Sequence, residues 1–551
     1  MLDRSNFLSL AAAAALLAGC ATPMATEPVK VRVLAINDFH GNLQAPRGGI
    51  RIHDPANPGK TINVDAGGAE HLASAVAELR KANPNHVFVA AGDLIGATPL
   101  LSALFRDEPT IESMSLMGLE MSAVGNHEFD KGTAELLRMQ NGGCHPSEGC
   151  KGPTTFKGAS FQYLAASTVD TKTGKTLLPA YKVKTFQGIP VAFIGLTLEA
   201  TPSIVVPAGV VGLKFRDEAQ TVNELVPLLQ KQGIEAIVVL IHEGGLSSGD
   251  YNNCPGISGP IVDIVKKFDK AVDVVVSGHT HRAYNCRIDG RLVTSADKYG
   301  TVVSAIDLVL DPKTRDVVSA VADNVIVRPS FAKDPRQTAL IAQYEKLVVP
   351  LAKRVVGRLG AALPRDANTA GESALGQVIA DAQLAATQDA GAMVAFMNPG
   401  GIRAALPMPA DGQLRYDDLF SVQPFYNNLV TMTLTGAQLL QLLEQQWAGQ
   451  GSGGRILHVS RGFSYRWDNA RPAGQRVVPG SVMLNGKPLD PLSNVRITVN
   501  AFMASGGDNF LVLKEGKEVH TGLMDIDALE AYVRNNPTLA PGALDRIVRL
   551  N

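Results

Sequence analysis

The sequence predicts an α/β protein of at least two domains joined by a helical connector. Three observations carry this prediction. The chain has 551 residues, strand-like and helix-like segments alternate along it, and residues 331–356 separate two stretches that each have apolar strands of their own. A single hydrophobic core stops growing near about 250–300 residues, so a chain of this length divides into two or three domains.

The composition is that of an ordinary globular protein. Hydrophobic residues make up 45% and charged residues 19%, and the formal net charge is −1 at pH 7. This balance gives no reason to expect a polybasic membrane patch or a nucleic-acid scaffold, so a nucleic-acid duplex is not an expected partner. After the N-terminus, no apolar run is long enough to span a bilayer.

Residues 1–20 have the features of an export signal. An apolar stretch over residues 8–17 follows Arg4 and ends in Leu17-Ala18-Gly19-Cys20. These last four residues resemble the lipobox of bacterial lipoproteins, in which the cysteine is lipidated; a plain secretory signal is the alternative. We therefore expect an exported periplasmic or cell-envelope lipoprotein, held at a membrane only by a lipid on Cys20, with residues 21–29 as a tether.

The remaining cysteines predict two disulfides, because their number is even and the chain is exported. Of the three pairings we favour Cys144–Cys150, which closes a short loop rich in Gly and Pro, together with Cys254–Cys286. Free thiols and a zinc site of four thiolates are the alternatives. No pair of cysteines has the close spacing of a structural zinc site.

In the first half of the chain, predicted strands end in side chains that suit metal ions. Predicted helices over residues 68–82, 110–117, 219–232 and 261–268 alternate with these strands. The strands and the residues that follow them are 31–36 with Asp38 and His40, 87–91 with Asp93, 120–124 with Asn126, 234–241 with His242, and 272–276 with His279 and His281. A metal site at the carboxyl ends of a sheet explains this pattern.

Seven nitrogen and oxygen ligands are too many for one tetrahedral ion and suit two divalent ions, with Asp93 as a plausible bridge. The pairs Asp38/His40 and His279/His281 are each separated by one residue, which on an extended segment directs both side chains to one side. Any one histidine alone is better explained as a core or loop residue. Mixed carboxylate and imidazole ligation suits zinc, manganese, iron or cobalt equally.

A candidate catalytic pair follows Asn126 directly. His127 and Asp130 are three residues apart, close enough for the carboxylate to orient the imidazole. The alternative is an ordinary polar turn after a strand. The ligand residues around it favour the catalytic interpretation.

The second half carries three loops with binding chemistry. Asn398 to Arg403 contains paired glycines and a planar guanidinium that suits an anionic oxygen. Phe425 and Phe502 could hold a nucleobase between their faces, and Asp508 could accept a ribose hydroxyl. Taken singly, each Phe is better explained as a core residue and each Gly pair as a turn.

The motifs Asp-x-His, Gly-Asp, Gly-Asn-His-Glu, a His after a strand, and Gly-His-x-His, in this order, resemble the calcineurin-like metallophosphatases. Asn-Asp-Phe-His-Gly, Gly-His-Thr-His, Gly-Gly-Ile-Arg and Phe-x-x-x-Gly-Gly-Asp are similar to the 5′-nucleotidase branch of that family, from about residue 30 to the C-terminus. The resemblance implies a four-layer αββα sandwich over residues 29–330, a helical linker over 331–356, and an α/β substrate-binding domain of the 5′-nucleotidase C-terminal type over 357–551.

The resemblance also implies roles for the site residues. One metal ion would be held by Asp38, His40, Asp93 and His281, the other by Asp93, Asn126, His242 and His279, and the nucleotide by Asn398, Arg403, Phe425, Phe502 and Asp508. Two departures stand out. Many nucleotidases have Gln or Asn in place of His281, and many have an Arg where this chain has Asn368-Thr-Ala-Gly371, with Arg365 as the nearest arginine.

The implied activity is hydrolysis of nucleotides to nucleoside and phosphate outside the cytoplasm with two divalent ions. A 2′,3′-cyclic-nucleotide phosphodiesterase/3′-nucleotidase, a UDP-sugar hydrolase and the related sulfur-oxidation hydrolase are alternatives on the same scaffold. A lipoprotein that captures nucleotides or metal without turnover is a non-enzymatic alternative, although capture does not need an oriented His127. The sequence leaves the native metal, the preferred nucleotide and the oligomeric state open.

Overall fold

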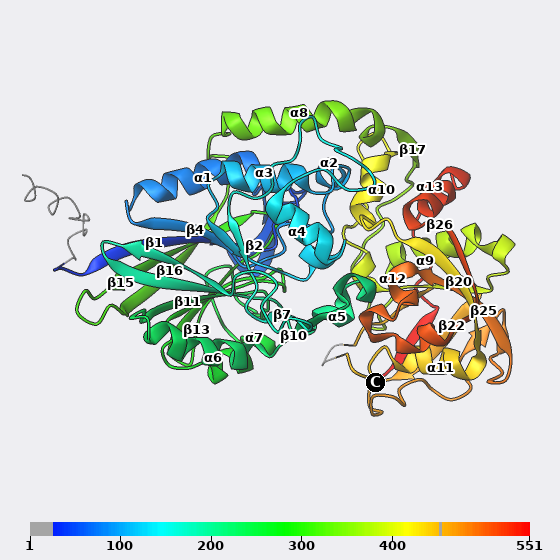
Figure 1. Cartoon of the computed structure of the whole chain (residues 1–551). Helices are drawn as coiled ribbons and strands as arrows, with labels where there is room; N and C mark the ends of the chain where they lie inside the picture. Colours follow the sequence, from blue (N-terminus) through cyan, green and yellow to red (C-terminus); the bar gives the residue numbers. More distant parts are fainter. Residues whose placement is uncertain (1–25, 451–453) are drawn as a thin grey trace, which may run out of the picture.

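The computed structural model describes residues 26–450 and 454–551, and it consists of an N-terminal α/β part, a connecting helix and a C-terminal α/β part (Figure 1). The predicted export signal and Cys20 lie outside the described residues. Within residues 26–450 and 454–551, no helix combines the length and the apolar character needed to cross a membrane.

Two six-stranded sheets form the N-terminal part. The first has the order β16-β15-β1-β4-β5-β6, and the second has the order β13-β14-β12-β11-β9-β8. The central strands of both sheets are parallel. The strands are β1 (Val29–Ile36), β4 (His86–Ala90), β5 (Met121–Ala123), β6 (Gln162–Leu164), β8 (Tyr181–Phe186), β9 (Ile189–Leu196), β11 (Ala236–Ile241), β12 (Val274–Ser277), β13 (Ala283–Ile288), β14 (Arg291–Ala296), β15 (Val302–Leu310) and β16 (Val317–Ile326).

The two sheets pack face to face, with helices on both outer faces. Successive residues of a strand point to opposite faces of its sheet. Val238 of β11 packs into the core between the two sheets, and Val239 packs into the core between its sheet and the covering helices. Because both faces are buried, the strands are continuous apolar runs. The covering helices are α1 (Ala69–Lys81) and α3 (Glu108–Leu116) on the first sheet and α6 (Glu218–Gln230) and α7 (Pro260–Lys267) on the second. The four-layer αββα arrangement is therefore confirmed.

Several smaller elements lie outside the two sheets and the four covering helices. They are the hairpin β2 (Ile50–Asp54) and β3 (Asn57–Val64), the ribbon β7 (Thr168–Asp170) and β10 (Leu213–Phe215), and the helices α2 (Leu100–Ala103), α4 (Thr133–Asn141) and α5 (Thr201–Ile204). Both favoured disulfides are present, Cys144–Cys150 after α4 and Cys254–Cys286 from the loop before α7 to β13.

The connector is the helix α8 (Pro335–Ala352). Asp334 caps it by accepting from the backbone N–H groups of residues 336 and 337, and Gln337 fastens it to the N-terminal part through a buried hydrogen bond with Ser113 (2.7 Å). The helix ends earlier than the predicted connector, because Val355 and Val356 belong to strand β17 (Val355–Arg358), which pairs with β19 (Gln413–Arg415).

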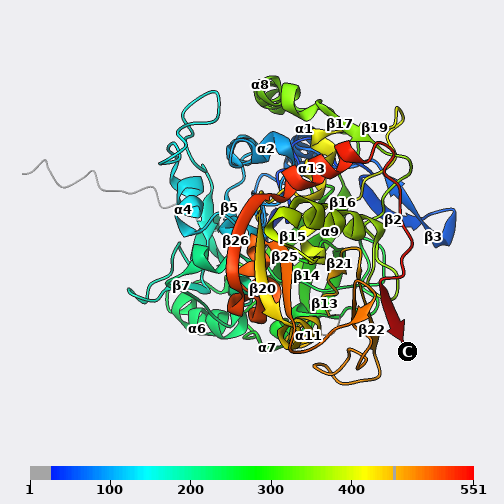
Figure 2. The same cartoon turned by 90° about the vertical axis from the view of Figure 1, so that its right-hand side faces the viewer.

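The C-terminal part, which faces the viewer in Figure 2, has a five-stranded sheet of order β21-β18-β25-β20-β26 and a four-stranded sheet of order β24-β23-β22-β27. Its strands are β18 (Val394–Met397), β20 (Asn428–Thr435), β21 (His458–Val459), β22 (Phe463–Asp468), β23 (Met483–Leu484), β24 (Lys487–Pro488), β25 (Asn494–Asn500), β26 (Lys517–Met524) and β27 (Ile547–Leu550). Its helices are α9 (Ala374–Ala386), α10 (Tyr416–Val422), α11 (Gly436–Glu444), α12 (Ala501–Ala504) and α13 (Asp525–Asn535).

Two neighbouring acidic side chains, Asp273 just before β12 and Asp316 just before β16, make stability depend on pH. Burial raises the pKa of Asp273 to about 8, and the neighbouring carboxylate of Asp316 acts in the same direction. The unfolded chain loses this proton near its ordinary pKa, about 3.9, and the folded chain keeps it up to about pH 8. Stability from this group is therefore lost as the pH rises between these values.

We expect Asp273→Asn to remove that loss. The amide oxygen can still accept from the backbone N–H of Ile237, as Oδ2 of Asp273 does at 2.8 Å. The melting temperature should change little at pH 4.5 and be at least about 2–4 °C higher at pH 8.5, since that rise corresponds to only roughly 1 kcal/mol and each unit of pKa shift is worth about 1.4 kcal/mol. Calorimetry at both pH values measures this. The exposed Asp389→Asn should show no such difference, and an equal gain at both pH values would contradict the explanation.

Candidate metal centre and active site

The residues after strands β1 and β12 lie on tight turns, so the extended geometry predicted for them is wrong. Asp38 has φ +50° and His40 has φ +45°. Their backbone N–H groups donate to the carbonyls of Gly92 and Asp93, both at 3.0 Å, which stabilises the left-handed backbone. The same left-handed φ recurs at Asp93 (+50°), His279 (+69°) and His281 (+53°).

Two glycines allow the ligand loops to approach one another. A Cβ on Gly125 would lie 2.2 Å from Oδ1 of Asp93, and a Cβ on Gly92, where φ is +85°, would lie 2.7 Å from Nδ1 of His242. Any larger residue would push the loops apart. The Gly-Asp and Gly-Asn motifs are therefore steric requirements of the site.

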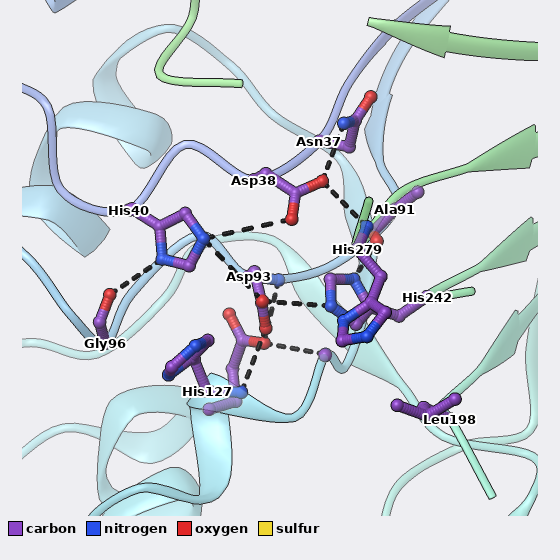
Figure 3. Close-up of polar contacts among 12 residues, drawn as sticks. Asn37, Asp38, His40, Ala91, Asp93, Gly96, His127, Leu198, His242 and His279 are labelled. Carbon is purple, nitrogen blue, oxygen red and sulfur yellow. Dashed lines mark hydrogen bonds and ion pairs between the residues drawn. The ribbon is translucent and has the colours of Figure 1, made fainter. Parts of the chain in front are cut away.

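One group of donor atoms joins the two sheets through Asp38, His40 and His281. Nε2 of His281 lies 3.2 Å from Oδ1 of Asp38, and Nε2 of His40 lies 3.8 Å from the same oxygen. Nδ1 of His40 is 2.8 Å from the carbonyl oxygen of Gly96. A carbonyl only accepts, so Nδ1 carries the proton and the lone pair of Nε2 faces the group (Figure 3).

A second group forms around Asp93, His242 and His279. Nε2 of His242 lies 2.9 Å from Oδ2 of Asp93, and the Nδ1 atom of the same ring is 2.8 Å from the carbonyl of Ala91. Oδ2 of Asp93 is also 3.7 Å from Nε2 of His40, so this carboxylate lies between the two groups (Figure 3). Burial raises the pKa of Asp93, but the imidazoles of His242 and His127 outweigh it and hold the pKa well below its usual range.

These donor atoms fit two divalent cations. Oδ1 of Asp38 and Oδ1 of Asn126 are buried and make no hydrogen bond within the described residues, and among them the only polar neighbour of the buried Nε2 of His242 is the carboxylate of Asp93. Nε2 of His40 and Nε2 of His281 face each other at 3.0 Å. Buried acceptors left unpaired or facing one another are costly in free energy, and cations between them would satisfy them. Carboxylate, amide and imidazole donors suit first-row divalent metals.

Glu128 is a functional residue that the sequence argument did not identify, although it lies within the Gly-Asn-His-Glu motif. Its carboxylate is 2% exposed and accepts from the backbone N–H groups of Asp93 (3.0 Å), Leu94 (2.8 Å) and Gly125 (2.6 Å). Burial raises its pKa to about 7, and the charge of Asp93 adds to the effect. Glu128 thereby ties the loop after β4 to the loop after β5.

His127 and Asp130 form the predicted pair, with Nδ1 of the ring 2.7 Å from Oδ2 of the carboxylate. Burial lowers the pKa of His127, but Asp130 and Asp93 outweigh it, so that the pKa is raised. The ring of Phe425, from the C-terminal part, stacks on the His127 ring at 6.1 Å between centroids and 20° between planes. The predicted catalytic pair therefore lies where the two halves of the chain meet.

A cavity of about 630 Å³ extends from this pair into the C-terminal part. The five substrate residues that the sequence singled out all line it, and so do Asn126, His127 and Asp130. Phe425 and Phe502 are half-buried and line the cavity, and Phe502 also packs against the core of the C-terminal part. The substrate residues are Asn398, Arg403, Phe425, Phe502 and Asp508.

Asp508 has two partners in the C-terminal part. Its Oδ2 accepts from Nδ2 of Asn398 at 2.7 Å, and its Oδ1 pairs with the guanidinium of Arg455. Arg455 was not predicted, because it lies in a Gly-rich stretch far from the other binding loops. Asp508 has φ +56°, so its carboxylate is fixed by a tight turn as well as by these partners.

Comparisons with known proteins agree with this geometry. The calcineurin-like phosphoesterase family matches residues 31–283, and the 5′-nucleotidase C-terminal domain family matches residues 353–515. The endonuclease YhcR of Bacillus subtilis is 33% identical over 512 residues, which are 92% of this chain but 40% of YhcR. This chain therefore spans about two fifths of the length of that relative.

With two further proteins, the match spans most of the relative's own length. The cell wall protein Lmo0130 of Listeria monocytogenes is 30% identical over 94% of this chain and 68% of its own length. The crystal structure of a 5′-nucleotidase precursor from Thermus thermophilus has a TM-score of 0.77 and 27% identity, and the match covers 95% of this chain and all of that one. With both halves matched in order, the chain belongs to the 5′-nucleotidase family of calcineurin-like phosphoesterases, a family of hydrolases.

Proposed function

We propose that the protein hydrolyses nucleoside 5′-monophosphates to nucleoside and phosphate with two divalent ions. One observation carries this proposal. The cavity of about 630 Å³, here called the aromatic cavity, reaches the candidate metal ligands Asn126 and His279 as well as His127, and Phe425 stacks on the His127 ring at 6.1 Å. A nucleoside bound in the cavity would present its 5′-oxygen to the catalytic pair. The name and structure of the Thermus thermophilus relative, a 5′-nucleotidase precursor, support the same substrate class.

The seven ligands would divide into Asp38, His40, Asp93 and His281 for one ion and Asp93, Asn126, His242 and His279 for the other. Ions bound there supply Lewis-acid activation of water and neutralise charge on the phosphoryl group. Arg403 would bind a phosphoryl oxygen through its guanidinium. His127, oriented by Asp130, would stabilise the charge that develops on the phosphoryl group or give a proton to the leaving 5′-oxygen.

Purified protein, stripped of metal and reloaded with zinc, manganese, cobalt or iron(II) in turn, tests the proposal. AMP should be the best of four substrates, ahead of UDP-glucose, 2′,3′-cyclic AMP and glycerol 2-phosphate. Preferred hydrolysis of UDP-glucose would identify a UDP-sugar hydrolase, and preferred hydrolysis of 2′,3′-cyclic AMP a cyclic phosphodiesterase. Hydrolysis of glycerol 2-phosphate as fast as AMP would identify an unselective phosphatase. The comparisons do not favour the first two of these alternatives. A folded preparation that hydrolyses none of the four with any ion would leave only nucleotide or metal capture.

The aromatic cavity gives a further prediction about substrate affinity. Removing the Phe425 or the Phe502 ring should raise KM for AMP about tenfold or more, because stacking of one base on one ring is worth about 1–3 kcal/mol. Steady-state kinetics of Phe425→Ala and Phe502→Ala would measure this. Glycerol 2-phosphate has no base, so its kcat/KM should change less than about twofold; an equal loss for both substrates would show that the rings only support the fold.

We also propose that the protein is exported and anchored by a lipid at Cys20. The two disulfides support export, since disulfides persist in oxidising compartments. Labelling cells with a radioactive fatty acid should mark the wild-type chain and leave Cys20→Ser unmarked.

A further inference from the structure

A second cavity adjoins the metal-ligand cluster on the side of His281. Its volume is about 700 Å³, and it shares four lining residues with the aromatic cavity: His127, His279, Arg403 and Arg455. The two cavities therefore meet at the cluster. We call it the cationic cavity, because its lining includes the following five basic side chains: Arg282, Lys298, Arg365, Arg403 and Arg455.

The positive charge in the cationic cavity is largely unbalanced. Among these five side chains, only Arg455 makes a salt bridge within the described residues, and its partner is Asp508 in the other cavity. Two carboxylates line the cavity, Asp93 in the metal-ligand cluster and Asp366 near Arg365, and the buried carboxyl of Asp297 lies behind Lys298 and Arg282. Unpaired cations gathered in a concave site attract anions strongly.

Two of the cations, Arg282 and Lys298, belong to the N-terminal part and are not needed by a nucleoside monophosphate. Arg282 directly follows His281 and is exposed. Nζ of Lys298 lies 5.2 Å from the ring centroid of Tyr299, which keeps this ammonium group near the cavity. A monophosphate held at the cluster, with its nucleoside among the phenylalanines, leaves both groups with only the buried carboxyl of Asp297 as an acidic neighbour and with no salt bridge among the described residues.

The two cavities differ in chemistry. The aromatic cavity contains Phe425, Tyr426 and Phe502, whereas the cationic cavity contains no Phe, Tyr or Trp among its described lining residues. Aromatic rings bind a nucleobase by stacking, and positively charged side chains bind a phosphate group. A substrate that continues past the scissile phosphorus would therefore place its next phosphate, rather than a base, against Arg282 and Lys298.

Building on the proposed nucleotidase function, we propose that the cationic cavity binds the next phosphate of a single-stranded oligonucleotide, so that the protein also hydrolyses phosphodiester links. The 3′-terminal nucleoside occupies the aromatic cavity. Water adds its oxygen to phosphorus, the bond from phosphorus to the 5′-oxygen breaks, and the leaving oxygen takes a proton. The products are a nucleoside and an oligonucleotide that ends in a 3′-phosphate.

The test compares dTpdTpdT, which has a second phosphate, with dTpdT, which has only the scissile one. We expect kcat/KM to be about tenfold higher for dTpdTpdT in the wild type, and this ratio to fall to about one in Arg282→Gln/Lys298→Gln. Chromatography should identify dT and dTpdTp as the products. The matched control, Lys313→Gln/Arg328→Gln, removes the same charge at two exposed positions outside both cavities and should keep the tenfold ratio.

Salt gives a second readout. Each phosphate contact adds about 0.7 to the slope of log(kcat/KM) against log[salt] for single strands, so the wild-type slope should be steeper for dTpdTpdT than for dTpdT. The charge variant should abolish that difference. A ratio of one in the wild type, or a tenfold ratio that survives the charge variant, would overturn the proposal. If AMP is cleaved and neither oligonucleotide is, this inference fails alone; if AMP is not cleaved, the proposed function fails with it.

Discussion

Asp93→Asn should abolish turnover, with kcat for AMP reduced by about 10³-fold or more. Oδ2 of Asp93 lies 2.9 Å from Nε2 of His242 and 3.7 Å from Nε2 of His40, so one carboxylate serves both donor groups. An amide has no negative charge for two cations to share. Losing even one ion from such a pair removes several kcal/mol of transition-state stabilisation, and each 1.36 kcal/mol is tenfold in rate.

Metal content separates this explanation from misfolding. After dialysis against buffer with a low concentration of the activating ion, the wild type should keep two ions per chain and Asp93→Asn one or none, measured by mass spectrometry of the metal. Circular dichroism should show the same helix and strand content in both. Asp366→Asn makes the same chemical change in the cationic cavity, outside the donor groups, and should keep both ions. Two ions retained in Asp93→Asn would contradict the bridging role.

His127→Gln should reduce kcat by about 10²–10⁴-fold, the usual contribution of a positioned acid or base. Nδ1 of His127 is held 2.7 Å from Oδ2 of Asp130, so the rest of the ring is directed toward the cavity that would hold the substrate. Asp130→Asn keeps the imidazole but changes its orienting partner, and a loss of about 10- to 100-fold is expected, as for other outer partners of functional histidines.

The His127→Gln variant also distinguishes a catalytic role of His127 from a metal-binding role. His127 also lies within reach of His40 and Asp93 as a potential third donor. If it acts on the substrate, His127→Gln should retain two ions and leave KM for AMP nearly unchanged. Loss of an ion would make it a ligand instead. Lys131→Gln, the next residue after Asp130 on the same cavity wall, should change kcat less than about twofold.

Much of the fold could be predicted from the sequence. The continuous apolar runs before Asp93, His242 and His279 mark buried parallel strands, because a strand covered on both faces has no polar side. Helix spacing found α1, α6 and α7 to within about two residues, a usual boundary error. The connector was predicted too long because Val355 and Val356 suit a strand as well as a helix, and only pairing with β19 decides between them.

The structure brings the predicted ligand and substrate residues together, but their local backbone geometry was not predicted. Left-handed backbone at Asp38, His40, His279 and His281 carries little signal in sequence, since it depends on hydrogen bonds from residues far along the chain. Glu128 was overlooked for a similar reason: its carboxylate accepts from four backbone N–H groups of two loops, and that requires knowing that the loops are adjacent.

By itself the sequence singled out the candidate ligands, the candidate catalytic pair and the favoured cysteine pairing, which the structure confirms, because residue type and spacing fix which chemistry is available. Only the tertiary structure decided that the ligands come from two facing sheets, β1, β4 and β5 in one and β11 and β12 in the other, rather than from a single sheet. It also decided that Arg282 and Lys298 share a cavity with arginines more than sixty residues away. The physical reason is that sheet packing and domain contact are long-range, whereas motif chemistry is local.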